Sequence, residues 1–483
     1  MKLQDLLRGV EVLETGADLQ MEITGVTDSS RQVQQGMLFL AVPGYATDGH
    51  KYIPDAVNRG AGVIVCEREM PDDAPWVRVK DARTAMAKIG AAWYGRPADH
   101  MEMIGVTGTN GKTSVTYLLK TLLEKALGTK VGLIGTIHNM IGDEILPGER
   151  TTPGAMELQG LLARMREAGC THVVMEVSSH ALVQHRVDEI PFRIGAFTNL
   201  TEDHLDFHHT MEAYGQAKAL LFKKCRDGVF NIDDPSADIM TEHAACTSYT
   251  VGLSSKAELQ GEHIVLAPDH IEMDVKEGKA LEKLSLQIPG RFTVSNALVV
   301  LGIARKLGIS LKAAVAALSQ AKGVKGRIEV VPTPGQNFTV IIDYAHTPDG
   351  LENILKSLKD FCRGRLIVVF GCGGDRDRNK RPIMGSIAAK YGDYVIVTSD
   401  NPRTEDPMKI IEDILPGMKD TKTPYIVEEN RRKAIRVALR SAKKDDMILL
   451  AGKGHETYQI IGTEKTHLDE REEVASALWE MQQ

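Results

Sequence analysis

The sequence predicts an α/β protein of three domains built on parallel sheets. Its 483 residues exceed one ordinary domain, and the 43% hydrophobic and 25% charged fractions are typical of globular chains. Short runs rich in Val, Ile and Leu alternate with amphipathic stretches, and glycines separate them. Strand-like runs that are apolar throughout favour parallel strands covered on both faces.

Two junctions divide the chain. Residues 94–102, YGRPADHME, interrupt a helical pattern with Gly and Pro before a new strand, and residues 326–337, GRIEVVPTPGQN, do so more strongly. The predicted domains are therefore 1–97, 98–327 and 328–483. The first is a smaller α/β domain, the second has a central parallel sheet and the third is Rossmann-like.

The expected strands lead into polar or glycine-rich loops. They are 62–66, 103–108, 171–179, 194–200, 339–345, 365–371, 394–399 and 446–452. Within the central domain, residues 240–290 carry weaker strand signals and predict no clear elements. The C-terminal ends of parallel strands are where ligands bind in open α/β sheets, so the loops after these strands are the places to search.

Charge and cysteine content exclude several classes of protein. A net charge of −7 and a pI near 6.1 argue against a general binder of nucleic acid or anionic membranes. The chain has no apolar run of about 18 residues and no signal-peptide core at its N-terminus. Six cysteines without a C-x-x-C pair indicate reduced thiols. We expect a cytoplasmic monomer with no membrane insertion.

A glycine loop follows the strand in residues 103–125, MIGVTGTNGKTSVTYLLKTLLEK, and precedes an amphipathic helix. Gly108 and Gly111 would let backbone N–H groups approach phosphate oxygens. Lys112 would add a positive charge for the outer phosphates, and the Thr113 hydroxyl can ligate Mg²⁺. The strict Walker spacing is not met, and a glycine turn with an incidental lysine is the alternative. The strand and helix on the correct sides favour ATP or GTP binding by a P-loop-type central sheet.

Two further strands end in groups that can ligate or titrate. MEVSSH, residues 175–180, offers Glu176, and NLTEDHLDFH, residues 199–208, offers His204. The two could together hold Mg²⁺, although Mg²⁺ prefers oxygen ligands and water. A cluster of hydrogen bonds at the strand ends is the alternative interpretation.

One lysine stands in an apolar helical turn. AYGQAKALLF, residues 213–222, contains Lys218, and long lysine side chains usually extend toward solvent, which is one interpretation. The other is a partly buried lysine with a lowered pKa, whose neutral amine can react with CO₂ to give a carbamate.

In this order, GTNGKT, TTPG, MEVSSH, TNLTEDHLD and YGQAKALLF resemble the Mur ligase family of ATP-dependent amide-forming enzymes. GTNGKT alone also fits the related folylpolyglutamate synthetases. The resemblance implies ATP-binding residues Gly108, Thr109, Asn110, Gly111, Lys112, Thr113, Asn296, Arg327 and Asp343. It implies metal ligation by Thr113, Glu176, His204 and carbamylated Lys218. Catalytic roles are implied for Lys112, Glu176, His204 and Lys218.

The N-terminal domain extends the resemblance. Residues 24–61 resemble the uridine-nucleotide domain of the branch of the family that adds the third residue of the peptide. The resemblance implies contacts with a UDP-muramyl-peptide from Ser30, Thr151, Thr152, Ser178, Gln184 and Arg186.

Three polar loops follow expected strands of the third domain: 370–382 (FGCGGDRDRNKRP), 398–407 (TSDNPRTEDP) and 451–459 (AGKGHETYQ). They should converge on one crevice. Arginines there could grip carboxylates in bidentate fashion, and carboxylates could accept from ammonium groups. Charged turns are the alternative, and within 398–407 Asp406 suits a helix N-cap and Pro407 the first helical position.

The DNPR part of the second loop resembles the family members that add meso-diaminopimelate. The implied acceptor site consists of Arg376, Asp400, Asn401, Pro402, Arg403, Gly452 and Glu456. The implied activity joins meso-diaminopimelate to UDP-N-acetylmuramoyl-L-alanyl-D-glutamate with ATP and Mg²⁺, through an acyl phosphate, in cytoplasmic peptidoglycan precursor synthesis. These small molecules are the expected partners.

Three alternatives remain open. A lysine-adding member of the same branch is the nearest. A folylpolyglutamate synthetase is disfavoured by the N-terminal domain. A nucleotide-dependent regulatory protein without catalysis is disfavoured by the presence of Thr113, Glu176, His204 and Lys218 together.

Overall fold

The computed structural model describes residues 1–44, 47–69, 74–148, 150–242 and 244–482; Tyr45 and Ala46 of the resembling stretch 24–61 lie outside them. The described chain forms two compact units, Met1–Thr250 and Val251–Gln483. Each unit has its own hydrophobic cores.

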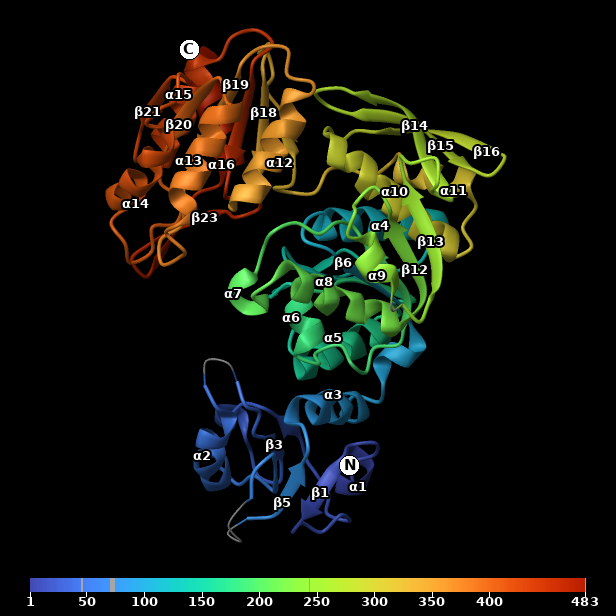
Figure 1. Ribbon diagram of the computed structural model, residues 1–483. Coiled ribbons are helices and arrows are strands. Elements are labelled where there is room, and N and C mark those ends of the chain that lie inside the picture. The colour runs from blue at the N-terminus through green and yellow to red at the C-terminus, as the bar shows by residue number, and fades with distance from the viewer. Residues whose placement is uncertain (45–46, 70–73, 149, 243, 483) are drawn as a thin grey trace. The chain divides into compact units, whose positions relative to one another are not determined.

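The first unit begins with a small sheet of strand order β1-β5-β4-β3-β2, parallel except for β1. Its strands are β1 (Val12–Thr15), β2 (Val26–Thr27), β3 (Leu38–Leu40), β4 (Val63–Cys66) and β5 (Trp76–Val79). Its helices are α1 (Leu3–Leu6), η1 (Ser30–Gln32), η2 (Gly49–Tyr52), α2 (Ile53–Asn58), α3 (Ala82–Trp93) and η3 (Pro97–His100). Side chains alternate between the faces, so that Leu38 and Leu40 pack with α1 and α3 while Phe39 packs with α2 (Figure 1).

A second sheet of this unit supplies the strand edge that matters for function. Its strands run β12-β11-β6-β10-β7-β8-β9, parallel from β12 to β7. They are β6 (Glu102–Thr107), β7 (Val131–Ile134), β8 (Asn139–Ile141), β9 (Glu144–Leu146), β10 (His172–Glu176), β11 (Phe192–Phe197) and β12 (Cys225–Asn231); β13 (Thr247–Gly252) runs across the division between the units. The helices are α4 (Lys112–Leu127), α5 (Ala155–Glu167), α6 (Ser179–Val183), α7 (Leu205–His208), α8 (Met211–Ala219), η4 (Leu220–Lys223) and α9 (Ala237–Glu242).

Helix α4 follows the glycine loop because the local sequence starts and stops it there. Gly111 begins the helix with φ of 84°, and Gly128 ends it with φ of 64°, where its N–H donates to Glu124 O. Buried Val115, Leu118, Leu119 and Leu122 recur at helical spacing. In the sheet, Glu176 of β10 pairs with Val106 of β6, and Phe197 of β11 with Thr107 of β6, so the loops after these three strands leave one edge together.

The second unit opens with an antiparallel meander of β14 (Leu259–Leu266), β15 (Ile271–Glu277) and β16 (Ala280–Leu286), against which α10 (Arg291–Lys306) and α11 (Leu311–Leu318) pack. Sequence reasoning predicted no clear elements here. Ile271, Met273 and Val275 are buried while the residues between them are polar. Strands apolar on one face only give a weaker signal than continuous runs, although the alternation is visible in the sequence.

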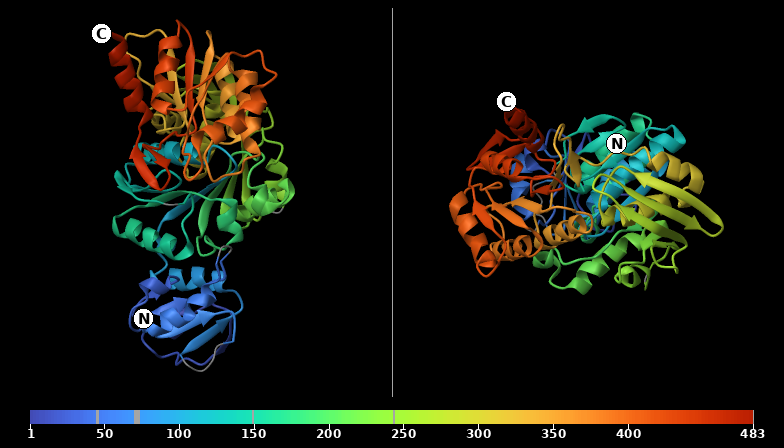
Figure 2. Two further views of the ribbon diagram at one scale, coloured as in Figure 1. Left: turned by 90° about the vertical axis from the view of Figure 1, so that its left-hand side faces the viewer. Right: turned by 90° about the horizontal axis from the view of Figure 1, so that it is seen from above.

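The last sheet has the strand order β17-β18-β22-β19-β20-β21, parallel except for β17. Its strands are β17 (Glu329–Val331), β18 (Thr339–Asp343), β19 (Leu366–Phe370), β20 (Tyr394–Val397), β21 (Tyr425–Val427) and β22 (Met447–Ala451), and β23 (Tyr458–Ile461) pairs with β24 (Glu464–His467) in a separate hairpin. The helices are α12 (Pro348–Lys359), α13 (Lys380–Tyr391), α14 (Pro407–Ile414), η5 (Leu415–Met418), α15 (Arg431–Ser441) and α16 (Glu470–Gln482). Helices α12, α13 and α14 cover one face, and α15 and α16 cover the other, as Figures 1 and 2 show.

The predicted α/β class with parallel sheets is confirmed. The eight expected strands correspond to β4, β6, β10, β11, β18, β19, β20 and β22, most of them one or two residues shorter than expected. Asp406 caps α14 by accepting from Met408 N–H, and Pro407 begins the helix, as predicted. The domain boundaries at 97 and 327 stay predictions. Among the described residues, no helix has the length and apolar character needed to cross a membrane.

Candidate functional site

The glycine loop after β6 packs closely against the neighbouring loop after β11. Thr109 N–H donates to Asn199 O at 2.8 Å, and a Cβ added at Gly108 would collide with Thr198 Oγ1. Lys112 Nζ lies over the loop, donating to Gly108 O at 2.9 Å and Thr109 O at 2.8 Å. Only glycine fits this close approach, and the loop ends at the N-terminus of α4, which is a suitable arrangement for phosphate.

Lys218 is buried beside this loop, with 1% of its surface exposed. Its Nζ donates to Gly108 O at 2.8 Å and lies 4.3 Å from the centre of the Tyr214 ring. Burial first, and then the charge of Lys112, lower the pKa of Lys218 well below its ordinary value of 10.5. The solvent-directed interpretation of Lys218 is therefore wrong, because the glycine loop covers the helical turn that carries it.

Glu176 ends β10 fully buried, with both carboxylate oxygens engaged. Oε1 accepts from Thr136 N–H at 2.9 Å and Oε2 from Thr136 Oγ1 at 3.0 Å. Thr136 Oγ1 also lies 3.0 Å from Thr151 Oγ1. The strand-end hydrogen-bond cluster considered above is present, and it holds this carboxylate in one orientation.

His204 lies on the loop after β11, at the start of α7, in the left-handed region with φ of 54°. Its ring centre is 4.9 Å from that of His180. Burial, and then the neighbouring His204 and His208, lower the pKa of His180 to about 4. His180 is therefore neutral at pH 7.

The oxygen donors at this edge fit Mg²⁺. The Glu176 carboxylate and the Thr113 hydroxyl are the hard oxygen ligands that Mg²⁺ prefers. Among the described residues, no three or more His, Cys, Asp or Glu side chains gather as a metal cluster. The predicted set contains only Glu176 and His204 of these types, so a Mg²⁺ ion here would complete its shell with hydroxyl, phosphate or water oxygens.

The residues expected to bind the muramyl-peptide gather around Thr152. Its Oγ1 donates to Glu176 O at 2.9 Å and accepts from Ser178 N–H at 3.1 Å. Arg186 donates to Thr152 O at 2.9 Å and, through Nε, to Gln184 Oε1 at 3.1 Å. The structure thus brings Thr152, Ser178, Gln184 and Arg186 together, and Thr151 adjoins them through the chain.

This group has an electropositive side. Burial, and then the charges of Arg150 and Arg83, lower the pKa of Arg186. Three arginines that influence one another would favour an anionic ligand. Ser30 lies elsewhere in the unit, at the start of η1, where its hydroxyl donates to the Asp55 carboxylate and lowers the pKa of Asp55.

In the second unit, Arg327 and Asp343 lie close together. The Asp343 carboxylate accepts from Ile328 N–H at 2.8 Å and from Ala345 N–H at 2.9 Å. Burial raises the pKa of Asp343, and the charge of Arg327 opposes the rise. The Arg327 guanidinium lies 4.9 Å from the centre of the Tyr344 ring. Asn296, the third predicted nucleotide residue of this unit, is buried in α10.

Two of the polar loops expected in the third domain meet through a buried lysine. Lys453 Nζ donates to Asn401 Oδ1 at 3.0 Å and to Glu456 Oε2 at 3.1 Å, and lies 3.9 Å from Asp400 Oδ1. Asn401 Nδ2 also donates to Glu456 Oε2 at 2.9 Å. A Cβ at Gly452, where φ is 111°, would lie 2.6 Å from Asp400 Oδ2, so glycine is required there.

The remaining loop, 370–382, contacts the loop 398–407 through Arg403. Its guanidinium donates to Gly374 O at 2.7 Å, and its backbone has φ of 51°. Gly374 N–H donates to Asn401 O at 2.9 Å, which ties the loops together directly. Arg376 lies in the loop 370–382, where its guanidinium donates to Asp375 O at 3.1 Å and is exposed. The predicted convergence of the three loops is present in the structure.

Glu405 anchors these arginine-rich loops. It accepts from the fully buried Arg381 at 2.8 and 3.1 Å and from Asp375 N–H at 2.6 Å. The hydrogen bonds from Arg381 lower the pKa of Glu405 to about 2. Pro402 lies between the anchored parts, and its carbonyl accepts from Glu405 N–H at 3.1 Å.

Three family models match the chain along most of its length. The model "Mur ligase family, catalytic domain" matches residues 22–94, "Mur ligase middle domain" matches 106–304, and "Mur ligase, glutamate ligase domain" matches 326–454. A relative from Caldanaerobacter subterraneus subsp. tengcongensis, named UDP-N-acetylmuramoyl-L-alanyl-D-glutamate--2,6-diaminopimelate ligase, is 48% identical over 99% of each chain. The chain belongs to the Mur ligase family.

Further comparisons agree with this Mur ligase assignment. A relative from Clostridium acetobutylicum, named UDP-N-acetylmuramoyl-L-alanyl-D-glutamate--2,6-diaminopimelate ligase 1, is 45% identical over 100% of each chain. A solved structure of a UDP-N-acetylmuramoyl-L-alanyl-D-glutamate--2,6-diaminopimelate ligase superposes with a TM-score of 0.73 at 31% identity, over 100% of this chain and 99% of the other. The predicted family is confirmed, while the roles of single residues in this Mur ligase stay predictions.

Sequence reasoning left several residues of these clusters without a role. Lys453 follows Gly452 directly in AGKGHETYQ, and a lysine between two glycines at a strand end was a visible signal. Arg150 immediately precedes TTPG and was equally visible. Thr136 gave no signal in this Mur ligase, because its contact with Glu176 depends on the pairing of β7 with β10.

Proposed function

We propose that this chain is an ATP-dependent ligase that joins meso-diaminopimelate to UDP-N-acetylmuramoyl-L-alanyl-D-glutamate in cytoplasmic peptidoglycan precursor synthesis. Family membership and relatives bearing that ligase name support the proposal. The observation that carries the acceptor assignment is the meeting of Asp400, Glu456 and Arg403 at one strand edge. Meso-diaminopimelate carries two ammonium and two carboxylate groups, and a site with both signs of charge suits it.

Acidic side chains would bind the ammonium groups of the acceptor, and arginines would bind its carboxylates. Asp400 and Glu456 accept from ammonium groups, while Arg376 and Arg403 donate to carboxylates. Asn401, Pro402 and Gly452 shape the backbone around them. In the structure Arg403 donates to Gly374 O, an uncharged partner that a substrate carboxylate can replace with a stronger, charge-assisted one.

At the first strand edge, the sugar-linked substrate and ATP would bind side by side. Thr151, Thr152, Ser178, Gln184 and Arg186 would hold the muramyl-peptide, with Ser30 in the N-terminal sheet domain contacting the sugar nucleotide. Residues 108–113 would hold the ATP phosphates. For Asn296, Arg327 and Asp343 of the second unit, a role in nucleotide binding stays a prediction from the family resemblance.

The reaction proceeds by activation of a carboxylate. The terminal carboxylate of the muramyl-dipeptide attacks the γ-phosphate, ADP leaves, and an amine of the acceptor displaces phosphate from the acyl phosphate through a tetrahedral intermediate. Lys112 and the loop N–H groups offset the negative charge where the two anions meet. The buried positions of Lys218 and Tyr214 would limit the entry of water that would hydrolyse the intermediate.

Magnesium fits this proposal through Thr113, Glu176, His204 and a carbamate on Lys218; when bound, the ion supplies charge neutralisation for phosphoryl transfer. The carbamate forms when the neutral Lys218 amine adds to CO₂, making an N–C bond and releasing one proton to solvent. The buried Nζ and its lowered pKa support this step, because only the neutral amine is nucleophilic. The carbamate would turn a cation into an anionic oxygen ligand.

The test is an assay of phosphate release with purified protein, ATP, Mg²⁺ and UDP-N-acetylmuramoyl-L-alanyl-D-glutamate, offered either meso-diaminopimelate or lysine. We expect release that depends on meso-diaminopimelate. Release that depends only on lysine would mean that lysine, and not meso-diaminopimelate, is the acceptor, and the protein would still be a ligase. No acceptor-dependent release with either amine would overturn the ligase proposal.

A further inference from the structure

A buried ion pair lies behind the acceptor loops, between α15 and α16. Arg431 is the first residue of α15 and Glu470 the first of α16, and neither side chain has any exposed surface. Arg431 Nε donates to Glu470 Oε1 at 2.8 Å. The desolvation of two buried charges commonly exceeds the gain from pairing them, so stability alone is a weak reason for this pair.

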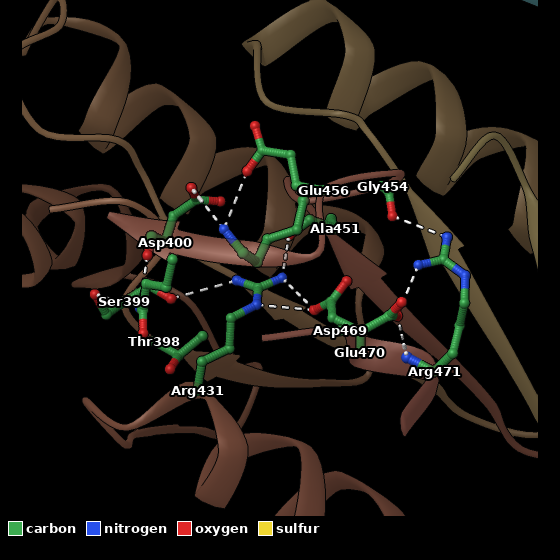
Figure 3. Close-up of polar contacts among 12 residues, drawn as sticks. Thr398, Ser399, Asp400, Arg431, Ala451, Gly454, Glu456, Asp469, Glu470 and Arg471 are labelled. Carbon is green, nitrogen blue, oxygen red and sulfur yellow. Dashed lines mark hydrogen bonds and ion pairs between the residues drawn. The ribbon is translucent and has the colours of Figure 1, made fainter. Parts of the chain in front are cut away.

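The other donors of Arg431 reach the two strands that lead into the acceptor loops (Figure 3). One terminal nitrogen donates to Ala451 O at 2.8 Å, at the last residue of β22, and the other to Ser399 O at 3.4 Å, after β20. The next residues in the chain are Gly452 and Asp400. A guanidinium has its donors in one rigid plane, so a single side chain fixes the spacing of both strand ends.

Charges of both signs surround this pair. The carboxylates of Asp400, Glu456 and Glu470 interact with the cations of Lys453 and Arg431. Burial by itself would raise the pKa of Asp400, but Lys453 first and then Arg431 hold it below its ordinary value. Asp400 therefore stays ionised at neutral pH, and its carboxylate can accept hydrogen bonds from an ammonium group that a ligand brings.

We infer that Arg431, held by Glu470, is a positioning residue of the acceptor site, which sets the spacing of the strand ends so that Asp400 and Glu456 meet one ammonium group of the acceptor. This inference rests on the proposed function. It makes the affinity for the acceptor depend on two residues that never touch it. A pair that only stabilised the fold could be exchanged for apolar side chains without effect on substrate binding.

The decisive variant replaces both charges at once, Arg431→Met with Glu470→Leu, so that no buried charge is left unpaired. We expect a folded enzyme whose KM for meso-diaminopimelate rises about 10-fold or more, as for a slight misplacement of binding groups. Its KM for ATP and for the UDP-muramyl-dipeptide should stay within about 2-fold, since only acceptor binding changes. An unchanged KM for meso-diaminopimelate would overturn the inference.

Two further variants separate positioning from stability. Arg436→Met is the matched control: Arg436 joins the same two helices through Glu473 and Glu480 and donates to neither Ser399 O nor Ala451 O. We expect its acceptor KM to equal that of the wild type, and a rise matching the double variant would overturn the inference.

Arg431→Lys keeps the charge but cannot span both carbonyls, so its acceptor KM should rise while its ATP KM does not. If the double variant fails to fold, Arg431→Lys still tests the inference, and an unchanged KM for the acceptor would then contradict it. A wild-type enzyme without acceptor-dependent turnover would count against the proposed function instead.

Discussion

Two buried lysines, Lys218 and Lys453, lie at two different strand edges and differ in what surrounds them. Lys218 is 1% exposed and donates to the uncharged Gly108 carbonyl over the Tyr214 ring. Lys453 is fully buried and lies among the Asn401 amide and the carboxylates of Glu456 and Asp400. Burial is nearly equal, so the partners make the difference.

The comparison shows how one residue type acquires opposite chemistry. Burial first, and then the charge of Lys112, lower the pKa of Lys218, and the charge of Asp203 only partly opposes them, so the neutral amine is favoured more than in an exposed lysine. A buried ammonium among carboxylates is a counter-ion and orients its neighbours. Lys218 is thus suited to react as an amine, and Lys453 is suited to orient the side chains of Asn401 and Glu456.

The largest effect is expected from replacing Lys218 by Arg or Ala. Both variants should lose turnover by about 10³-fold, the scale of losing one preorganised electrostatic group. A guanidinium keeps the positive charge but forms no carbamate, so Arg should fail as Ala does. Phosphate release at saturating substrates measures the loss, and near-normal activity of Lys218→Arg would refute the carbamate role.

Substitution by Met should lower the free energy of unfolding at Lys453 but not at Lys218. Lys453→Met removes the buried cation beside Asp400 and the partly buried Glu456, while Arg431 still acts on Asp400, and it should lower the free energy of unfolding by about 3 kcal/mol. Lys218→Met removes a buried amine whose hydrogen bond goes to the uncharged Gly108 carbonyl, so stability at pH 7 should stay equal or rise. Urea unfolding of both variants beside the wild type measures this, and equal losses would contradict the contrast.

Within the acceptor site, Arg403→Ala should raise the KM for meso-diaminopimelate about 10- to 100-fold, the range of one charge-assisted hydrogen bond. The KM for ATP should change less than about 2-fold, because Arg403 is not among the residues proposed to bind ATP. Arg378→Ala is the matched control, since this neighbouring arginine is exposed and, in the part of the chain that the structure describes, its ion pair is with Glu405. A change confined to the KM for ATP would place Arg403 outside the acceptor site.

The smallest effect is a pH dependence of stability from Lys218. Its pKa is lowered in the folded chain, so between that value and 10.5 the unfolded chain binds more protons than the folded one. Wild-type stability relative to Lys218→Met should therefore rise with pH through this window, by at most about 1.4 kcal/mol per pH unit. The difference should level off above pH 10.5. A pH series of urea titrations measures it, and a difference that falls with pH would contradict the assignment.

Strand ends and loop chemistry were open to prediction because their signals are local. Continuous apolar runs located β6, β10 and β22, and the polar loops after them carried the candidate residues. The meander from β14 to β16 was missed because β15 alternates buried apolar with polar side chains, and β14 and β16 carry few buried apolar residues. Convergence of the loops also followed from a general rule, that parallel strands place their carboxyl ends at one edge.

The sequence by itself determined the α/β class, the glycine loop, the DNPR loop and the resemblance to the Mur ligase family, because each depends on residues close together in the chain. Only the tertiary structure decided the direction of Lys218, since the carbonyl it meets lies 110 residues away in the sequence. The same holds for Arg431 and Glu470, which are 39 residues apart and meet because two helices cover one face of a sheet. Whether a buried charge is reactive or structural depends on its partners, and these are brought together only when the chain folds.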